Sequence, residues 1–125
     1  MNYTFRLNGD IPSKKNSRIV LKNGKNIPSK AYQDWHKSAY ISLYYQKLEQ
    51  GLKLPIDSPV TVCIEFCYKD KKRKDCDNGL SSILDTLVDS GVLKDDKWQI
   101  VKNVVIENRL CSLGASSCKI TILEL

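Results

Sequence analysis

The segment that most restricts the fold runs from Pro59 to Tyr68, where large apolar residues alternate with smaller or polar ones. An alternation with a period of two predicts a β-strand with one buried face. The apolar side chains Val60, Val62, Ile64, Phe66 and Tyr68 form that face. A helical period follows, in which Leu80, Ile83, Leu84, Leu87 and Val88 form one apolar stripe. These two patterns therefore predict that the apolar face of the strand and the apolar stripe of the helix are both buried.

The other elements follow from the same patterns. Short strands are predicted at Tyr3–Leu7, Ile100–Ile106 and Cys118–Ile122, and a first helix is predicted between Ser29, its N-cap, and Gly51. Residues 11–29, rich in Pro, Gly, Asn and Lys, predict a long polar loop or a loose hairpin. The resulting order, β-α-β-α-β-β, indicates an α+β class: one domain over residues 1–125, with a single mixed sheet of about four strands and two main helices.

Positive charge is concentrated in two places. The formal net charge is +6, which weakly favours an anionic partner. Solvated loops are also rich in lysine, so a basic run alone does not decide the matter. Two basic runs on either side of one acidic motif favour contacts with nucleic-acid phosphates. The candidate DNA-binding residues are Lys14, Lys15, Arg18, Lys71, Lys72, Arg73 and Lys74.

The cysteines and the single histidine argue against a zinc site of the usual kind. The five cysteines include no CxxC pair, and His36 is expected to be a partly exposed helix residue. Free thiols suit a reducing cytoplasm, which is the expected location. The first ten residues lack the apolar core of a signal peptide, and no apolar run is long enough to cross a bilayer. We expect no membrane partner and no small-molecule cofactor.

Two pairs of aspartates are the candidates for chemistry. Asp75 and Asp77 lie two residues apart between the strand and the second helix, and Asp95 and Asp96 follow that helix. Carboxylates so close together repel each other unless a hard divalent cation lies between them. The simpler alternatives are that Asp77 caps the helix, that Asp75 forms a surface ion pair, and that Asp95-Asp96 is a turn. A calcium-binding EF-hand is excluded by spacing, because position 12 of such a loop would be Thr86.

The segment D-C-D-N-G-L-S-S-I-L-D-T-L, residues 75–87, followed by G-V-L-K-D-D-K-W-Q-I, residues 91–100, resembles the RusA family of Holliday junction resolvases. The segment P-S-K-K-N, residues 12–16, also matches the basic, Asn-containing loop near the start of family members. The resemblance implies a homodimeric endonuclease that cuts four-way DNA junctions symmetrically with Mg²⁺ or Mn²⁺. Carried over by position, the metal-binding and catalytic residues are Asp75, Asp77 and Asp96.

One position departs from the family pattern. Many members carry a lysine four residues after the second aspartate of D-x-D, and this chain has Ser81 there. Lys74 or Lys14 could take over that role. Three hypotheses therefore stay open: a junction-resolving nuclease, a branched-DNA-binding protein that has lost turnover, and a protein that binds Ca²⁺ or another partner through its acidic loop.

Overall fold

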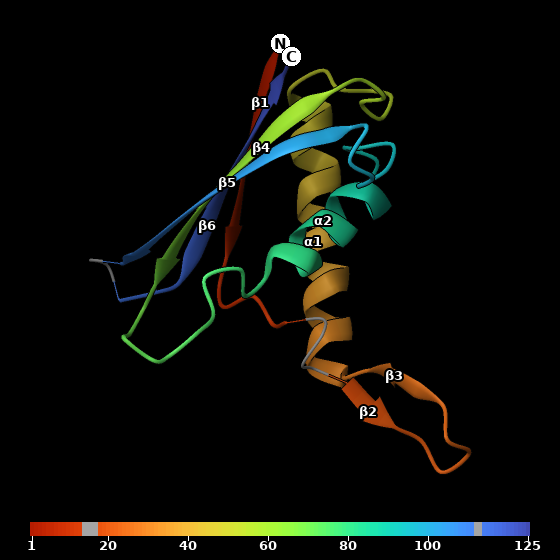
Figure 1. Ribbon diagram of the computed structural model, residues 1–125, viewed down its shortest axis with the longest axis vertical. Helices are drawn as coiled ribbons and strands as arrows, with labels where there is room; N and C mark the ends of the chain where they lie inside the picture. The colour runs from red at the N-terminus through yellow and green to blue at the C-terminus, as the bar shows by residue number, and fades with distance from the viewer. Residues whose placement is uncertain (14–17, 112–113) are drawn as a thin grey trace.

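The structure is a computed structural model that describes residues 1–13, 18–111 and 114–125. A four-stranded mixed sheet carries two helices, and a small two-stranded hairpin projects away from it (Figure 1). The predicted α+β class, with two helices on a mixed four-stranded sheet, is confirmed. The elements along the chain are β1 (Asn2–Asn8), β2 (Arg18–Val20), β3 (Asn26–Pro28), α1 (Lys30–Glu49), β4 (Val60–Tyr68), α2 (Leu80–Asp89), β5 (Val101–Leu110) and β6 (Ser117–Glu124).

The spatial order of the sheet is β1-β6-β4-β5. Strand β6 pairs antiparallel with both β1 and β4, whereas β4 and β5 are parallel. Parallel neighbours need a crossover connection, and α2 supplies it by running back from the end of β4 to the start of β5. The first and last strands lie side by side, so the two termini meet at one end of the sheet (Figure 1).

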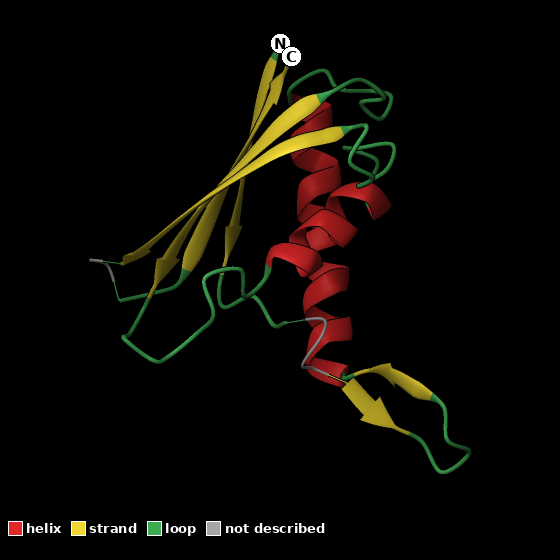
Figure 2. Ribbon diagram, in the orientation of Figure 1, coloured by secondary structure: helices red, strands yellow, loops and turns green. Residues whose placement is uncertain are grey.

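Both helices cover the same face of the sheet (Figure 2). The alternation predicted for residues 60–68 is confirmed, because every second side chain from Val60 to Phe66 is buried. These side chains join Phe5, Ile120 and Ile122 from the neighbouring strands and Leu43, Ile83 and Leu87 from the helices in one core. Neither described helix is long and apolar enough to cross a membrane.

The helix ends agree only in part with the prediction. The Ser29 hydroxyl accepts a hydrogen bond from the Tyr32 amide at 3.2 Å, so it is the N-cap of α1 as predicted. Gly51 and Gly91 have φ values of 79° and 81° and follow the C-caps of α1 and α2, also as predicted. The alternative that Asp77 caps α2 was wrong. The N-cap is Gly79, which makes no side-chain hydrogen bond, so the Asp77 carboxylate is not used as a cap.

The polar segment before α1 contains more structure than a loop. Strands β2 and β3 pair antiparallel, with Ile19 opposite Ile27, and the Arg18 side chain donates to the Asn26 side-chain oxygen at 3.2 Å. The hairpin leads directly into the first turn of α1 and points away from the sheet (Figure 2). Of the two alternatives left open by the sequence, the hairpin is confirmed.

The five cysteines are free thiols. Cys118 lies on the covered face of the sheet, and burial raises its pKa to about 12. Cys63 and Cys67 lie on the opposite, uncovered face and are half-buried. Of these three cysteines, only Cys118 is a core side chain.

The two edges of the sheet differ. Along β1, the side-chain amides of Gln46 and Gln50 from α1 replace a neighbouring strand. Each amide oxygen accepts from a backbone N–H of β1, and each amide nitrogen donates to the carbonyl of the same residue, Arg6 for Gln46 and Thr4 for Gln50, at 2.8–2.9 Å. Among the described residues, β5 has a neighbour on one side only, and it exposes Val104, Val105 and Leu110.

The double variant Gln46→Ala/Gln50→Ala is expected to lower the free energy of unfolding by about 2 kcal/mol, since four exposed hydrogen bonds contribute roughly 0.5 kcal/mol each. It should also aggregate faster, because an uncovered strand edge pairs with other chains. Urea unfolding and light scattering measure the two effects. Gln33→Ala is the control, because Gln33 bonds to the carbonyl of Pro28 in the β2–β3 hairpin and not to the edge of the four-stranded sheet. Equal loss of stability in the control would contradict the assigned role.

Candidate active site

Asp75 and Asp77 lie in two consecutive turns between β4 and α2. The Asn78 amide donates to the carbonyl of Asp75, and the Leu80 amide donates to the carbonyl of Asp77, both at 3.0 Å. The Asn108 side chain of β5 accepts from the Tyr68 hydroxyl at 2.7 Å and donates to the carbonyl of Cys76 at 3.4 Å. These bonds fix the backbone of the turns on the ends of β4 and β5. The two carboxylates remain exposed to solvent.

Gly79 ends these turns and starts the helix. Its φ of 103° lies in the left-handed region, which other residues rarely adopt. A Cβ atom there would lie 3.1 Å from the Ile11 side chain and 3.5 Å from the Phe66 ring. The Ser82 hydroxyl donates to the carbonyl of Pro12 at 2.6 Å, which holds the segment after β1 against the same helix. Position 79 therefore requires glycine for two reasons, its left-handed φ and the close approach of the Ile11 side chain.

The two aspartates share a surface pocket of about 430 Å³. Asp75 and Asp77 line it together with Asn78 and Ser81 from the start of α2, and Ser13 from the segment after β1. Ser81, at the position where the family pattern often has lysine, therefore lies in the same pocket as the acids. Exposed carboxylates, an amide and hydroxyls form a set of oxygen donors that suits Mg²⁺ or Mn²⁺.

Asp95 and Asp96 lie in the turn beyond the other end of α2. Leu93 bridges to Ile56, the segment before β4, and the Lys94 amide donates to the carbonyl of Ile56 at 2.9 Å. The Asp96 amide donates to the Asp95 carboxylate at 2.7 Å, and both side chains are exposed. Because α2 spans about 15 Å, one chain does not bring Asp96 into the pocket of Asp75 and Asp77. The three acids that the sequence resemblance groups together are therefore not brought together within one chain.

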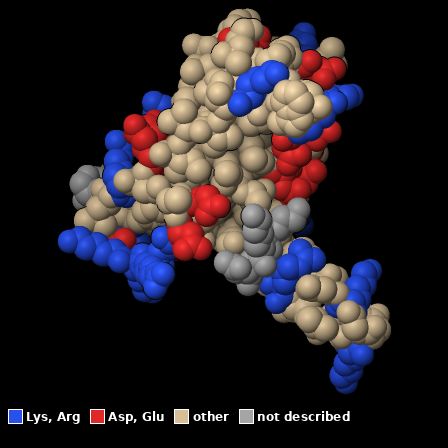
Figure 3. All heavy atoms as spheres, in the orientation of Figure 1, with Lys and Arg blue, Asp and Glu red and all other residues tan. Residues whose placement is uncertain are grey.

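The basic residues lie on either side of the acidic turns. Lys71, Lys72 and Arg73 are exposed in the loop after β4, and the Lys74 ammonium lies 5.5 Å from the centre of the Tyr68 ring. Figure 3 shows basic side chains on this loop and on the β2–β3 hairpin, with acidic side chains between them. Arg18 belongs to the hairpin. The predicted DNA-binding residues Lys14 and Lys15 lie outside the described residues.

The sequence profile of endodeoxyribonuclease RusA matches residues 9–122, which is most of the chain. The chain belongs to the RusA family. Membership implies a nuclease that acts on DNA junctions, and the resemblance noted from D-C-D-N and D-D is thereby confirmed. No curated protein sequence matches the chain.

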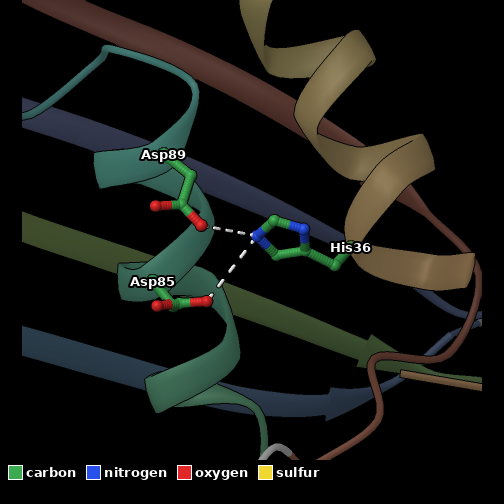
Figure 4. Close-up of side chains that lie close together, drawn as sticks. All are labelled: His36, Asp85 and Asp89. Atoms are coloured by element: carbon green, nitrogen blue, oxygen red, sulfur yellow. Dashed lines mark hydrogen bonds and ion pairs between the residues drawn. The ribbon is translucent and has the colours of Figure 1, made fainter. Parts of the chain in front are cut away.

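This RusA-family chain also contains a cluster that the sequence interpretation missed. The Nε2 atom of His36 on α1 lies 2.8 Å from a carboxylate oxygen of Asp89 and 3.6 Å from one of Asp85, both on α2 (Figure 4). The Tyr32 hydroxyl donates to the same Asp85 oxygen at 2.9 Å. Burial, the hydrogen bond to Asp85 and the negative charges of Asp85 and Asp89 raise the pKa of Tyr32.

Signals for this cluster do exist in the sequence. Asp85 and Asp89 are four residues apart and so share one face of α2, and Tyr32 and His36 have the same spacing on α1. The spacing within each helix predicts each pair. It does not predict that the two faces meet, because that depends on how the helices pack on the sheet.

Gly79→Ala should destabilise the fold and distort the acidic turns. The left-handed φ costs an alanine about 1–2 kcal/mol, and the contact with Ile11 adds to this. Gly51→Ala is the control, because it has the same sign of φ but its Cβ would meet nothing within 4 Å. Chemical denaturation should show a larger loss for Gly79→Ala than for Gly51→Ala. Equal losses would show that the contact with Ile11 relaxes without cost.

Proposed function

We propose that the protein is a metal-dependent endodeoxyribonuclease that resolves four-way DNA junctions by symmetric phosphodiester hydrolysis. The observation that carries this proposal is the exposed pair of carboxylates, Asp75 and Asp77, at the start of α2. The family match and the basic residues on either side of the pair support it. The proposed metal ligands and catalytic residues are Asp75, Asp77 and Asp96, with Mg²⁺ or Mn²⁺ as cofactor.

The chemistry requires these residue types. A bound divalent cation lowers the pKa of a water and polarises the phosphate. The residues of the chain hold the cation and admit the DNA. Asp75 and Asp77 would hold it through carboxylate oxygens, and the N-terminal end of α2 presents backbone N–H groups that favour an anionic phosphate. Lys71, Lys72 and Arg73 contact phosphates nearby.

The third acid, Asp96, requires a second copy of the chain. A two-fold axis through an antiparallel pair of β5 edges would place the start of each β5 beside the end of the partner's β5. The turn with Asp96 precedes β5, and the turns with Asp75 and Asp77 follow β4, the parallel neighbour of β5. Each Asp96 would then approach the partner's Asp75 and Asp77.

Spacing within such a dimer is consistent with helix packing. The two α2 helices would lie two strand separations apart, about 10 Å, which matches the usual distance between packed helices. Leu80, Leu84 and Val88 form a half-buried stripe on α2 that suits this contact. The outer face of α1 also exposes apolar side chains, among them Tyr44 and Tyr45. A dimer formed through the outer face of α1 would not bring the two α2 helices into contact, in contrast to a dimer formed through β5.

A second candidate function has one observation in its favour. Ser81 lies in the pocket of the acids where many family members carry lysine, and serine provides no positive charge there. The protein would then bind branched DNA without cleaving it. Cleavage of a synthetic four-way junction in the presence of Mg²⁺ distinguishes the two functions.

Asp75→Asn, Asp77→Asn and Asp96→Asn should each abolish cleavage and leave junction binding intact, because each removes a ligand charge but keeps the shape. Mixing the inactive Asp77→Asn and Asp96→Asn proteins should restore about a quarter of the wild-type sites if Asp96 acts across the dimer. In a mixed dimer one site has lost both residues and the other site is wild-type. The products should be single nicks, since each mixed dimer has one active site.

Two results would contradict this arrangement. Mixed dimers that form but do not cleave would show that Asp96 does not act across the dimer. Full activity in Asp96→Asn would remove this residue from the ligand set, and Asp95→Asn would be tested next. Asp57→Asn is the control, because Asp57 is also exposed and lies in the segment that precedes β4.

Lys71→Gln/Lys72→Gln should weaken junction binding and flatten the plot of log affinity against log salt concentration. The slope should fall by about one for each lost phosphate contact, and adding Arg73→Gln should lower it again. Lys37→Gln/Lys53→Gln is the matched control, because it removes the same charge from exposed positions outside the basic loop. An identical slope in both double variants would show that the loop after β4 does not contact DNA.

A further inference from the structure

The His36–Asp85–Asp89 cluster brings one nitrogen and two oxygen donors together between α1 and α2 (Figure 4). One ligand atom from each of the three side chains lies within 4.8 Å of the other two. The Nε2 atom of His36 can donate one hydrogen bond, and the 2.8 Å contact with Asp89 uses it. The 3.6 Å separation from Asp85 is too long for a second hydrogen bond. The three donors nevertheless point to one place.

The distances fit a metal ion. Neighbouring ligands at about 2.1 Å from a metal lie about 3.0–3.4 Å from each other in octahedral or tetrahedral geometry. The separations of 2.8 Å and 3.6 Å from Nε2 bracket this range, so small side-chain rotations complete the geometry. Two carboxylates carry two negative charges that a divalent cation neutralises. All three side chains are between a quarter and a half exposed, so waters can fill the remaining positions.

The donor set also selects the kind of ion. Imidazole suits zinc and its neighbours in the first transition row, whereas Mg²⁺ prefers oxygen ligands only. The cluster therefore differs in chemistry from the pocket of Asp75 and Asp77. Tyr32 adds a further contact, because its hydroxyl donates to the Asp85 carboxylate and so orients it.

We propose that His36, Asp85 and Asp89 form a second metal site, which binds a transition-metal dication such as Zn²⁺ and fixes α1 on α2. His36 lies in the second turn of α1, close to the β2–β3 hairpin, and Asp85 lies in the second turn of α2, close to the acidic pocket. The bound ion fixes the basic hairpin relative to the start of α2. This site does not depend on the proposed nuclease activity.

Thermal unfolding of the full chain with ZnCl₂ tests the site. The background variant Asp75→Asn/Asp77→Asn removes the other acidic pocket. We expect Tm to rise with the logarithm of the Zn²⁺ concentration, by about 10 °C at a hundredfold excess over Kd. MgCl₂ at the same concentrations should leave Tm unchanged. The experiment includes no nuclease assay, so the absence of a Tm rise would not bear on the proposed cleavage activity.

Matched variants assign the effect to the three residues. His36→Gln and Asp89→Asn, on the same background, should each lose the Zn²⁺-dependent rise, while Asp34→Asn, which changes an exposed aspartate of α1, should keep it. All of these variants retain the five cysteines, so zinc bound by thiols contributes equally to each. Asp89→Asn is the gentler change, because Asp89 is nearly half exposed. Titration with Co²⁺ adds a spectrum, in which thiolate ligands would give an intense near-ultraviolet band.

Two outcomes would overturn the proposal. One is the absence of any Zn²⁺-dependent rise in the parent protein. The other is a rise of the same size in His36→Gln or Asp89→Asn, which would place the zinc on other ligands. A loss of the rise in both variants, with no thiolate band in the parent, supports the site.

Discussion

The parallel pairing of β4 with β5 determines where the three candidate acids lie. Parallel neighbours cannot be joined by a tight turn, so the chain must cross back over the sheet, and α2 makes that crossing. The polar turns that follow β4 and the turn that precedes β5 are therefore at opposite ends of one helix. Asp75 and Asp77 are at the first place and Asp96 is at the second. A site that uses all three must span two chains.

The two edges of the sheet are covered differently, which bears on whether the proposed site spans two chains. An uncovered edge strand can pair with other chains and aggregate. At β1, two glutamine amides of α1 cover the edge. Strand β5 has ten residues and exposes valines at its edge, yet none of the described residues covers it. Protection at one edge and exposure at the other is expected when the second edge belongs to an interface. In the proposed dimer, pairing of β5 with a second copy would cover this edge and bring the three proposed acids together in one step.

Much of the fold could be predicted because burial imposes a period on the sequence. The alternation of Val60 to Phe66 and the helical stripe of Leu80 to Val88 identify the elements and their inner faces. The direction in which strands pair leaves no such period, so the parallel pairing could not be predicted. Asp77 was a reasonable candidate for the helix cap, but the left-handed turn at Gly79 provides the helix start instead. The cluster around His36 depends on packing between helices, which no local pattern records.

Helix α2 concentrates the chemistry of the domain because its faces and ends meet different surroundings. Its start is open to solvent and presents oxygen donors only, an environment in which a hard cation keeps most of its waters. Its middle and end face α1, where an imidazole joins two carboxylates that are partly shielded from solvent. The kind of donor atom, and not the total negative charge, would decide which metal each of the two proposed sites prefers. An imidazole ligand would discriminate against Mg²⁺ at the proposed second site, whereas an oxygen-only pocket accepts Zn²⁺ as well as Mg²⁺, so the occupant of the pocket depends on which ion is available.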